Sequence, residues 1–219
     1  MAISEAVDLS GHLPAVRDQG PRDTCVAFGV TCAHEFARNP RVALSEEALY
    51  WACKIVDGDW DNGTTFDAAK QGLRASGQPD ARVWPYDVTH TQGDPLSPPG
   101  AGPDATWKRA ELSPVSPDEL GVCAALADRR VVVLGVELTP QWYLVDESGA
   151  LAPLAGGEPV LGLHAVAAVG YDRRGGTLHI RNSWGSGWAR SGYASLPFEY
   201  FRHITDAWTV PPSGLDPRP

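Results

Sequence analysis

The sequence lacks two features that would place it in large protein classes. It has no run of apolar residues long enough to cross a bilayer, so we expect no membrane-spanning segment and no membrane partner. It also has no excess of basic residues, because 18 Lys and Arg stand against 27 Asp and Glu, a formal net charge of −9. Nucleic-acid binding needs a basic surface, so this balance argues against a nucleic-acid partner and permits a cationic substrate.

The opening segment and the cysteines add two further absences. The segment MAISEAVDLSGHLPAV lacks the basic and apolar stretches of an export signal. The four cysteines form no CxxC pair and no metal-ligand spacing; they are Cys25, Cys32, Cys53 and Cys123. We therefore expect no metal or organic cofactor, reduced thiols rather than disulfides, and a cytoplasmic location.

The composition is that of a folded protein with a substantial core. Apolar residues make up 43% of the 219 residues and charged residues 21%. This length suits one domain, residues 1–219, built from two small lobes around a cleft. Region 93–117 is rich in Pro, Gly and Ser, which is typical of a connector. It separates a mainly helical lobe, about 11–92, from a mainly β lobe, about 118–210.

Helix signals dominate before the connector, and strand signals dominate after it. Three helices are expected in the first part, at Cys25–Arg38, Glu46–Cys53 and Asp67–Ala75. After the connector, Ser116 is the expected N-cap of another helix, with Pro117 at its first position and Glu119 completing a capping box. Four segments have the β-branched or alternating residues typical of strands, at 131–137, 164–171, 177–181 and 192–196.

A thiol, a base and an amide that can orient the base occur in an order that suits acyl transfer. Cys25 begins the first expected helix, His164 lies on an apolar strand, and Asn182 follows downstream. The positive end of the helix and a protonated His164 both favour the thiolate, which is the reactive form. Asn182 can fix the imidazole. The Gln19 side chain and the Cys25 backbone N–H are candidate donors to an oxyanion.

Each of these residues also has a structural interpretation. A lone cysteine is often a buried small hydrophobe. A lone histidine on an apolar strand more often belongs to the core, and an isolated Asn or Gln to a turn or loop. Cys32, Cys53 and Cys123 fit this interpretation, and we assign them to the core. The catalytic interpretation of the other four gains weight because they occur together in a workable order.

At these residues the chain resembles the papain-like cysteine peptidases, in which a Cys near the mature N-terminus is followed far downstream by His and Asn. The segment Gln19-Gly20…Cys25-x-Ala27-Phe28 is similar to the oxyanion glutamine and nucleophile of that family. His164-Ala165-Val166 is similar to its histidine strand, and Asn182-Ser183-Trp184-Gly185-x-Gly187-Trp188 is the most specific match. Asn62-Gly63 resembles the loop that binds the substrate backbone, and Trp84-Pro85-Tyr86 resembles a family landmark.

The resemblance implies an α+β, papain-like two-lobe fold. A mainly helical N-terminal lobe and a C-terminal antiparallel β-barrel-like lobe would have the active site in the cleft between them. It implies that Cys25 is the nucleophile, His164 the general base and acid, and Asn182 its orienter, with Gln19 in the oxyanion hole. The residues expected to contact substrate or shield the site are Gly63, Thr64, Phe66, Leu163, Ala165 and Trp184.

The chain departs from the family pattern at three positions near the nucleophile and substrate. Arg22 replaces a structural cysteine, so the disulfide usual in this loop cannot form. Asp23 places a negative charge near the thiolate, which Arg22 is expected to offset. Thr64 replaces the second glycine of the substrate loop, so a substrate backbone is expected to be held differently or crowded. Since no long prodomain precedes this start, we expect control by narrow specificity, a rare substrate or a regulatory protein partner.

The favoured hypothesis is a cytoplasmic, prodomain-less thiol protease that cleaves an amide bond of a peptide or protein substrate through a Cys25 thioester. Two alternatives stay open. A cleft that excludes water and admits an amine would make the protein an acyltransferase, or a peptide ligase or cyclase in a biosynthetic pathway. The altered loop around Cys25 also permits a catalytically weak module that binds peptides.

Overall fold

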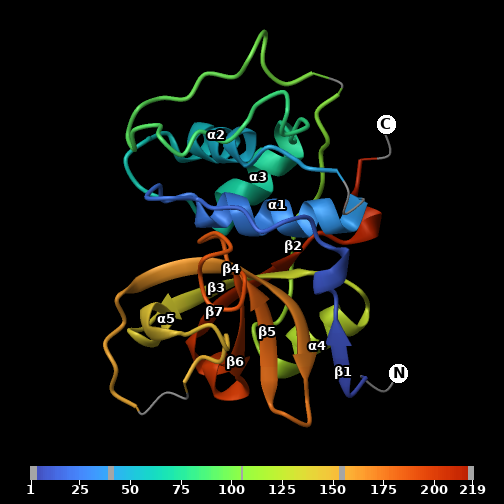
Figure 1. Cartoon of the computed structure of the whole chain (residues 1–219). Helices are drawn as coiled ribbons and strands as arrows, with labels where there is room; N and C mark the ends of the chain where they lie inside the picture. The colour runs from blue at the N-terminus through green and yellow to red at the C-terminus, as the bar shows by residue number, and fades with distance from the viewer. Residues whose placement is uncertain (1–3, 39–41, 105, 153–155, 217–219) are drawn as a thin grey trace.

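The computed structural model describes residues 4–38, 42–104, 106–152 and 156–216, which form a helical side and a β side (Figure 1). The helical side contains α1 (Cys25–Arg38), α2 (Glu46–Asp57) and α3 (Phe66–Ala75). The β side contains the sheet together with α4 (Glu119–Ala127) and α5 (Gln141–Leu144). Within the described ranges, no helix is long and apolar enough to span a membrane.

Side-chain caps determine where two of the helices on the helical side begin. The Ser45 hydroxyl accepts the Ala48 N–H at 3.0 Å at the start of α2, and the Thr65 hydroxyl accepts the Ala68 N–H at 3.1 Å at the start of α3. Helix α2 extends past its predicted end and stops at Gly58, whose φ of 76° suits a residue without a Cβ.

The predicted N-cap of α4 is wrong. Asp118 caps this helix, because its Oδ1 accepts the Gly121 N–H at 2.7 Å. The Ser116 hydroxyl instead donates to the other carboxylate oxygen of Asp118 at 2.6 Å. A carboxylate is a stronger acceptor than a hydroxyl, so Asp118 takes the helix N–H and Ser116 orients the carboxylate.

The strands form one sheet with the order β2-β7-β3-β4-β5-β6, and β1 pairs with β4. All these pairings are antiparallel. The strands are β1 (Ala6–Asp8), β2 (Ser113–Pro114), β3 (Val132–Leu138), β4 (Gly162–Asp172), β5 (Thr177–Arg181), β6 (Tyr193–Pro197) and β7 (Ile204–Thr209). Three short 3-10 helices complete the description, at Ser10–His12, Phe198–His203 and Pro212–Gly214. Among the described residues, β2 and β6 do not pair with each other, so the sheet stays open and is not closed into a barrel.

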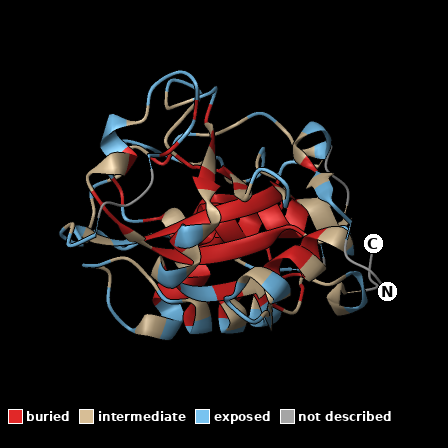
Figure 2. Cartoon of the chain, turned by 90° about the horizontal axis from the view of Figure 1, so that it is seen from below, coloured by how far each residue is buried: buried red, intermediate tan, exposed pale blue. Residues whose placement is uncertain are grey.

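The core lies where α1 crosses the sheet. Gly29 permits this close approach, because a Cβ at this position would lie 2.6 Å from the Cγ1 of Val133 in β3. Val26 and Val30 of α1 are buried together with Val133, and each such side chain contributes about 1.5–3 kcal/mol through burial. Figure 2 shows the buried residues concentrated in the central elements, with exposed residues in the peripheral loops.

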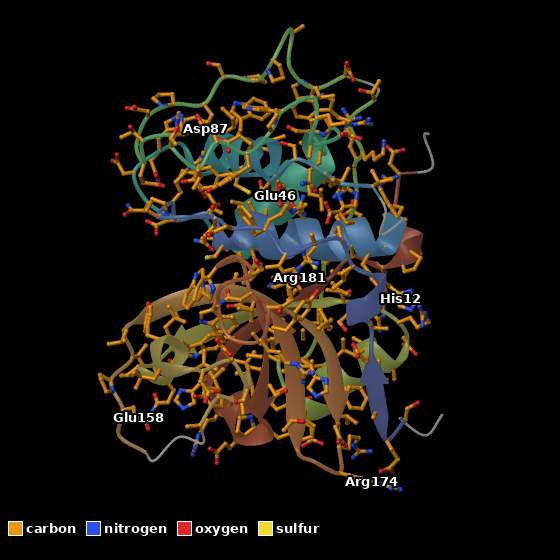
Figure 3. The ribbon with its side chains drawn as sticks, viewed as in Figure 1. His12, Glu46, Asp87, Glu158, Arg174 and Arg181 are labelled. Atoms are coloured by element: carbon orange, nitrogen blue, oxygen red, sulfur yellow. The ribbon has the colours of Figure 1, made fainter. Side chains whose placement is uncertain are left out.

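The N-terminal segment connects the two sides of the molecule. After β1 pairs with β4, the chain runs past Arg181 of β5, whose guanidinium donates to the carbonyl oxygens of Pro14 and Ala15 at 2.8 and 2.6 Å. Figure 3 shows Arg181 at the border between α1 and the sheet. The backbone N–H of Gln19 then donates to the Ser183 carbonyl at 2.8 Å. Gln19 is therefore fixed to the β side just before the chain enters α1.

Candidate active site

Cys25 is the first residue of α1, and it lines a cleft between the helical and β sides. The backbone N–H of Ala165, the neighbour of His164 in β4, lies near the Cys25 Sγ and acts to lower the pKa of the thiol. All four cysteines are free thiols. Cys32, Cys53 and Cys123 are buried, as expected for core residues, whereas Cys25 is only partly buried.

His164 is held in one orientation on β4. The Oδ1 of Asn182 lies 2.7 Å from His164 Nε2 and also accepts the Ser183 N–H at 2.8 Å. An amide oxygen carries no proton and can only accept, so Nε2 carries the imidazole proton and Nδ1 is the basic nitrogen. The ring of Trp184 lies 4.8 Å from the His164 ring, where it covers the contact with Asn182. The predicted base and its orienter are therefore brought together, and the covering role expected of Trp184 fits this position.

Burial affects the charge of both reactive groups. Burial raises the pKa of the Cys25 thiol, while the backbone N–H groups of Ala165 and Val26 oppose this shift. Burial lowers the pKa of His164 to about 4, against the opposing effect of its hydrogen bond to Asn182. Each group taken singly favours its neutral form. The predicted thiolate–imidazolium pair thus depends on the mutual attraction of the two charges rather than on either environment alone.

The side chain of Gln19 is locked at both ends. Its Nε2 donates to the Arg22 carbonyl at 2.8 Å, and its Oε1 accepts the Ser183 hydroxyl at 2.6 Å. Gln19 is buried with 7% exposure. Nε2 carries a second proton that an oxyanion beside Cys25 could accept. The amide is therefore fixed in one orientation, and its role in the oxyanion hole stays a prediction.

Arg22 does not offset the charge of Asp23, contrary to the expectation from the sequence. Its guanidinium forms a two-pronged ion pair with Glu47 of α2 at 2.7 and 2.9 Å, and both side chains are almost completely buried. It also donates to the Asp87 carbonyl at 2.7 Å and lies 4.7 Å from the centre of the Tyr86 ring. The planar guanidinium matches a carboxylate with two oxygens, so Glu47 binds it. Arg22 therefore anchors residues 19–24, here called the nucleophile loop, to α2.

The cleft has a volume of about 620 Å³ and is bordered by both Cys25 and His164. Its walls include five of the six residues expected around the substrate, Gly63, Thr64, Phe66, Leu163 and Ala165. Leu163 is 71% exposed and provides an apolar wall. The Thr64 hydroxyl is buried beside the Cys53 thiol, and the effect of Thr64 on a bound substrate stays a prediction. Trp184 lies on the far side of His164 and is not part of this wall.

The cleft also contains charged residues that were not assigned from the sequence. Its lining includes one lysine, Lys54, and five aspartates, Asp23, Asp57, Asp59, Asp67 and Asp206. Lys54 is neutralised locally, because its Nζ lies 2.9 Å from Asp59 and 3.3 Å from Asp57. The remaining three aspartates make the cleft acidic. The acidic residues next to Asn62-Gly63 could have indicated an acidic cleft from the sequence alone. Asp206 could not have been assigned to the cleft in this way, because β7, on which it lies, has no recognisable strand pattern.

A metal centre is not formed in the described part of the chain. No three His, Cys, Asp or Glu side chains gather there closely enough to hold a metal ion.

A thiol at a helix N-terminus, facing an imidazole–amide pair across a cleft, defines a protein built for thiol-dependent acyl transfer. Comparison with known families specifies the class further. The model of the papain family cysteine proteases matches residues 3–203, and the chain belongs to this family.

Similar proteins and structures agree with this assignment. Cathepsin L 1 of Paramecium tetraurelia is 30% identical over 195 residues, covering 84% of this chain and 55% of the relative. The cathepsin L-like proteinase of Fasciola hepatica is 26% identical over 211 residues, covering 89% of this chain and 60% of the relative. The chain thus spans only 55–60% of the length of these curated relatives.

Among solved structures, xylellain, a cysteine protease from Xylella fastidiosa, superimposes with a TM-score of 0.84 at 25% identity, covering 96% of this chain and 87% of xylellain. The Carica candamarcensis cysteine protease CMS1MS2 was solved in complex with E-64. It superimposes with a TM-score of 0.71 at 22% identity, covering 95% of this chain and 99% of the Carica protein. These likenesses confirm the papain-like two-lobe fold predicted from the sequence.

Proposed function

We propose that the protein is a cysteine peptidase that hydrolyses a peptide or amide bond through a thioester on Cys25. The observation that carries this proposal is the His164 imidazole, which is oriented by Asn182 and borders the same cleft as Cys25. Family membership supports a thiol-dependent hydrolase over the other hypotheses. Transfer to an amine and simple peptide binding remain outcomes that the experiment below can detect.

The proposed reaction has two halves. As Cys25 Sγ attacks the substrate carbonyl carbon, its proton moves to His164 Nδ1. The oxyanion receives hydrogen bonds from the Cys25 N–H and Gln19 Nε2, each of which is worth about 3 kcal/mol of barrier. The C–N bond then breaks, and His164 returns its proton to the leaving amine. In the second half, His164 takes a proton from water, the hydroxide attacks the thioester, and the acid leaves as the thiol is restored.

The buried environment suits this sequence of proton transfers. A single charge on either Cys25 or His164 is disfavoured by burial. Moving the proton from the thiol to the imidazole creates both charges together, and their attraction is strong where water is excluded. Asn182 keeps Nδ1 available by binding the proton on Nε2. The site therefore favours transfer of the proton within the pair over its loss to solvent.

We further propose that the substrate carries basic side chains. Lys54 offsets one of the two charges of Asp57 and Asp59, so the cleft keeps the second of these negative charges in addition to those of Asp23, Asp67 and Asp206. A negative potential attracts cationic peptides and repels acidic ones. A cytoplasmic location is also proposed, supported by the four free thiols, and with it control by a regulatory protein partner.

The test is a mass-spectrometric screen of peptides incubated with the wild type, Cys25→Ser and Cys123→Ser. We expect cleavage by the wild type and Cys123→Ser, and none by Cys25→Ser. Adding an amine separates hydrolysis from transfer, because an amide product would replace part of the acid. Iodoacetamide at pH near 6 should modify Cys25 before Cys53, and His164→Ala should remove this preference. No cleavage, together with equal labelling of Cys25 and Cys53, would overturn the proposal.

A further inference from the structure

Gln92 lies between the nucleophile loop and residues 59–64, here called the substrate loop, which line the cleft beside each other. Its Oε1 accepts the backbone N–H of Asp23 at 3.3 Å. Its Nε2 donates to the Tyr50 hydroxyl at 2.8 Å and also lies 3.2–3.3 Å from three substrate-loop carbonyl oxygens, those of Trp60, Asp61 and Asn62. One amide therefore contacts both loops, accepting from one and donating toward the other.

Helix α2 supplies two further side chains to the same place. The Tyr50 hydroxyl donates to the Asn62 carbonyl at 3.1 Å. Lys54 Nζ donates to the carbonyls of Asn62 and Gly63 at 3.1 and 2.9 Å. Lys54 is 1% exposed, and its ion pairs with aspartates keep its pKa raised despite burial. The substrate loop is thus tied to α2 through its own backbone carbonyls.

The two loops also lie close to each other. A Cβ on Gly63 would lie 3.4 Å from the Asp23 carbonyl oxygen and 3.6 Å from the Asp23 Cβ, so the loops approach each other closely enough at this point that a side chain would touch Asp23. Tyr50 joins this point to the Arg22 anchor, because the guanidinium lies 5.5 Å from the centre of the Tyr50 ring. A shift of either loop would change the separation between Cys25 and the backbone of the substrate loop.

We propose that Gln92, Tyr50 and Lys54 form a polar brace that fixes the substrate loop against the nucleophile loop, with Gln92 as a positioning residue for peptide substrates. The inference rests on the proposed function, in which a peptide lies along this cleft. Binding and positioning depend on loop geometry to a fraction of an ångström, so removing the brace weakens substrate binding more than it affects the chemistry of the thiol. Because the brace contains no disulfide, it keeps its geometry in a reducing medium.

The experiment compares Gln92→Ala with Gln71→Ala, which removes the same side chain from an exposed position on α3. For an extended peptide substrate, Gln92→Ala is expected to raise KM about fivefold to tenfold with kcat changed less than about twofold. The rate of Cys25 alkylation by iodoacetamide should stay at the wild-type value. Hydrogen–deuterium exchange of residues 59–64 should accelerate in Gln92→Ala and not in Gln71→Ala.

A second variant sharpens the result. Gln92→Glu keeps an acceptor for the Asp23 N–H, but it replaces the amide donor with a carboxylate oxygen. This oxygen would face the carbonyl oxygens of the substrate loop and be repelled by them. The KM of this variant should therefore rise at least as much as that of Gln92→Ala. Unchanged KM and unchanged exchange in both variants would overturn the brace. A fall in kcat or in alkylation rate at constant KM would also overturn it, by placing the effect on the nucleophile. Should the wild type cleave no peptide, the proposed function fails, while the exchange measurement still decides whether the brace exists.

Discussion

The two sides of the cleft are held in place by different kinds of interaction. On the β side, His164 belongs to β4, which is paired along its length with β3 and β5 through backbone hydrogen bonds. On the helical side, the nucleophile and substrate loops depend on a few side chains, chiefly Arg22, Lys54 and Gln92. A strand ladder distributes its stabilisation over many peptide groups, so no single side chain holds it. The position of the base should therefore tolerate substitution better than the position of the nucleophile and substrate.

The largest effect is expected from breaking the Arg22 anchor. Arg22→Met leaves Glu47 as a buried, unpaired charge, which should lower the free energy of unfolding by about 3–5 kcal/mol. The double variant Arg22→Met/Glu47→Leu should recover much of this loss, since it removes both charges. Arg82→Met is the matched control, because Arg82 pairs with Asp80 while 90% exposed and should change the stability little. Equal urea midpoints for Arg22→Met and Arg82→Met would refute the comparison.

Gln19 is next, because its side chain is hydrogen-bonded to both sides of the cleft. Gln19→Ala removes the proposed side-chain donor to the oxyanion, so kcat should fall about 10²- to 10³-fold with a much smaller change in KM. Steady-state kinetics on a peptide substrate measure this, with Gln71→Ala as the control. A wild-type kcat in Gln19→Ala would show that the backbone N–H of Cys25 suffices.

Acid should weaken both sides, since each contains one buried histidine. Burial lowers the pKa of His34 on α1 and of His164 on β4 to about 4. Between pH 6.5 and 4 the unfolded chain therefore binds more protons at these sites, and stability falls as the pH falls. Glu46 opposes this loss of stability. Burial raises its pKa to about 7, so between its ordinary pKa of 4.5 and pH 7 the folded state holds a proton that the unfolded state lacks.

The unfolded state takes up protons at two histidines, but Glu46 offsets part of this uptake, and so does Glu35, whose pKa is also raised by burial. Stability should therefore fall by at most on the order of 1 kcal/mol per pH unit between pH 6.5 and 4.5. Urea unfolding at several pH values measures this slope. His34→Gln and His164→Gln should each make the dependence of stability on pH less steep. The two reductions should be similar if acid weakens the two sides of the molecule equally. A slope that neither substitution changes would contradict the assignment to these residues.

The smallest effect is expected on the wall of the cleft. Asp206→Asn removes a charge from an exposed position on β7, so its effect is reduced by solvent. The ratio of kcat/KM for a basic peptide to that for a neutral peptide should fall about twofold to fivefold. The control is Asp128→Asn, which changes a charge outside this cleft. The same ratio in both variants would show that Asp206 does not contribute to selectivity.

Much of the fold follows from local sequence signals. Helix α1 and strand β5 have the predicted bounds, Cys25–Arg38 and Thr177–Arg181, because each has a clear apolar pattern and a clear end. The strands β1, β2 and β7 were not predicted. The first two are very short, and two consecutive exposed residues interrupt the alternation of β7, so these strands form through their pairing partners rather than through their own pattern.

The catalytic geometry was easier to predict than the surroundings of the site. The His164–Asn182 contact was predicted from motifs that place His164 on a strand and Asn182 directly after the neighbouring strand. Arg22 was assigned to the nearby Asp23, but its partner is Glu47, which lies 25 positions away in sequence and close in space. The role of Gln92 had no local signal at all. Which charges and amides meet depends on how the loops pack, and the sequence pattern alone does not contain this information.

The pairing of β1 with β4 has a consequence for synthesis on the ribosome. Val7 lies opposite Tyr171, so the first strand to be made waits for a partner from the last quarter of the chain. Helices α1 to α3 pack through contacts close in sequence and can gather early. Gln19 acquires its hydrogen bonds to Ser183 only after that residue has been added. A nascent chain thus carries its thiol long before the groups that activate it, and the reactive centre is assembled only after Ser183 has been added.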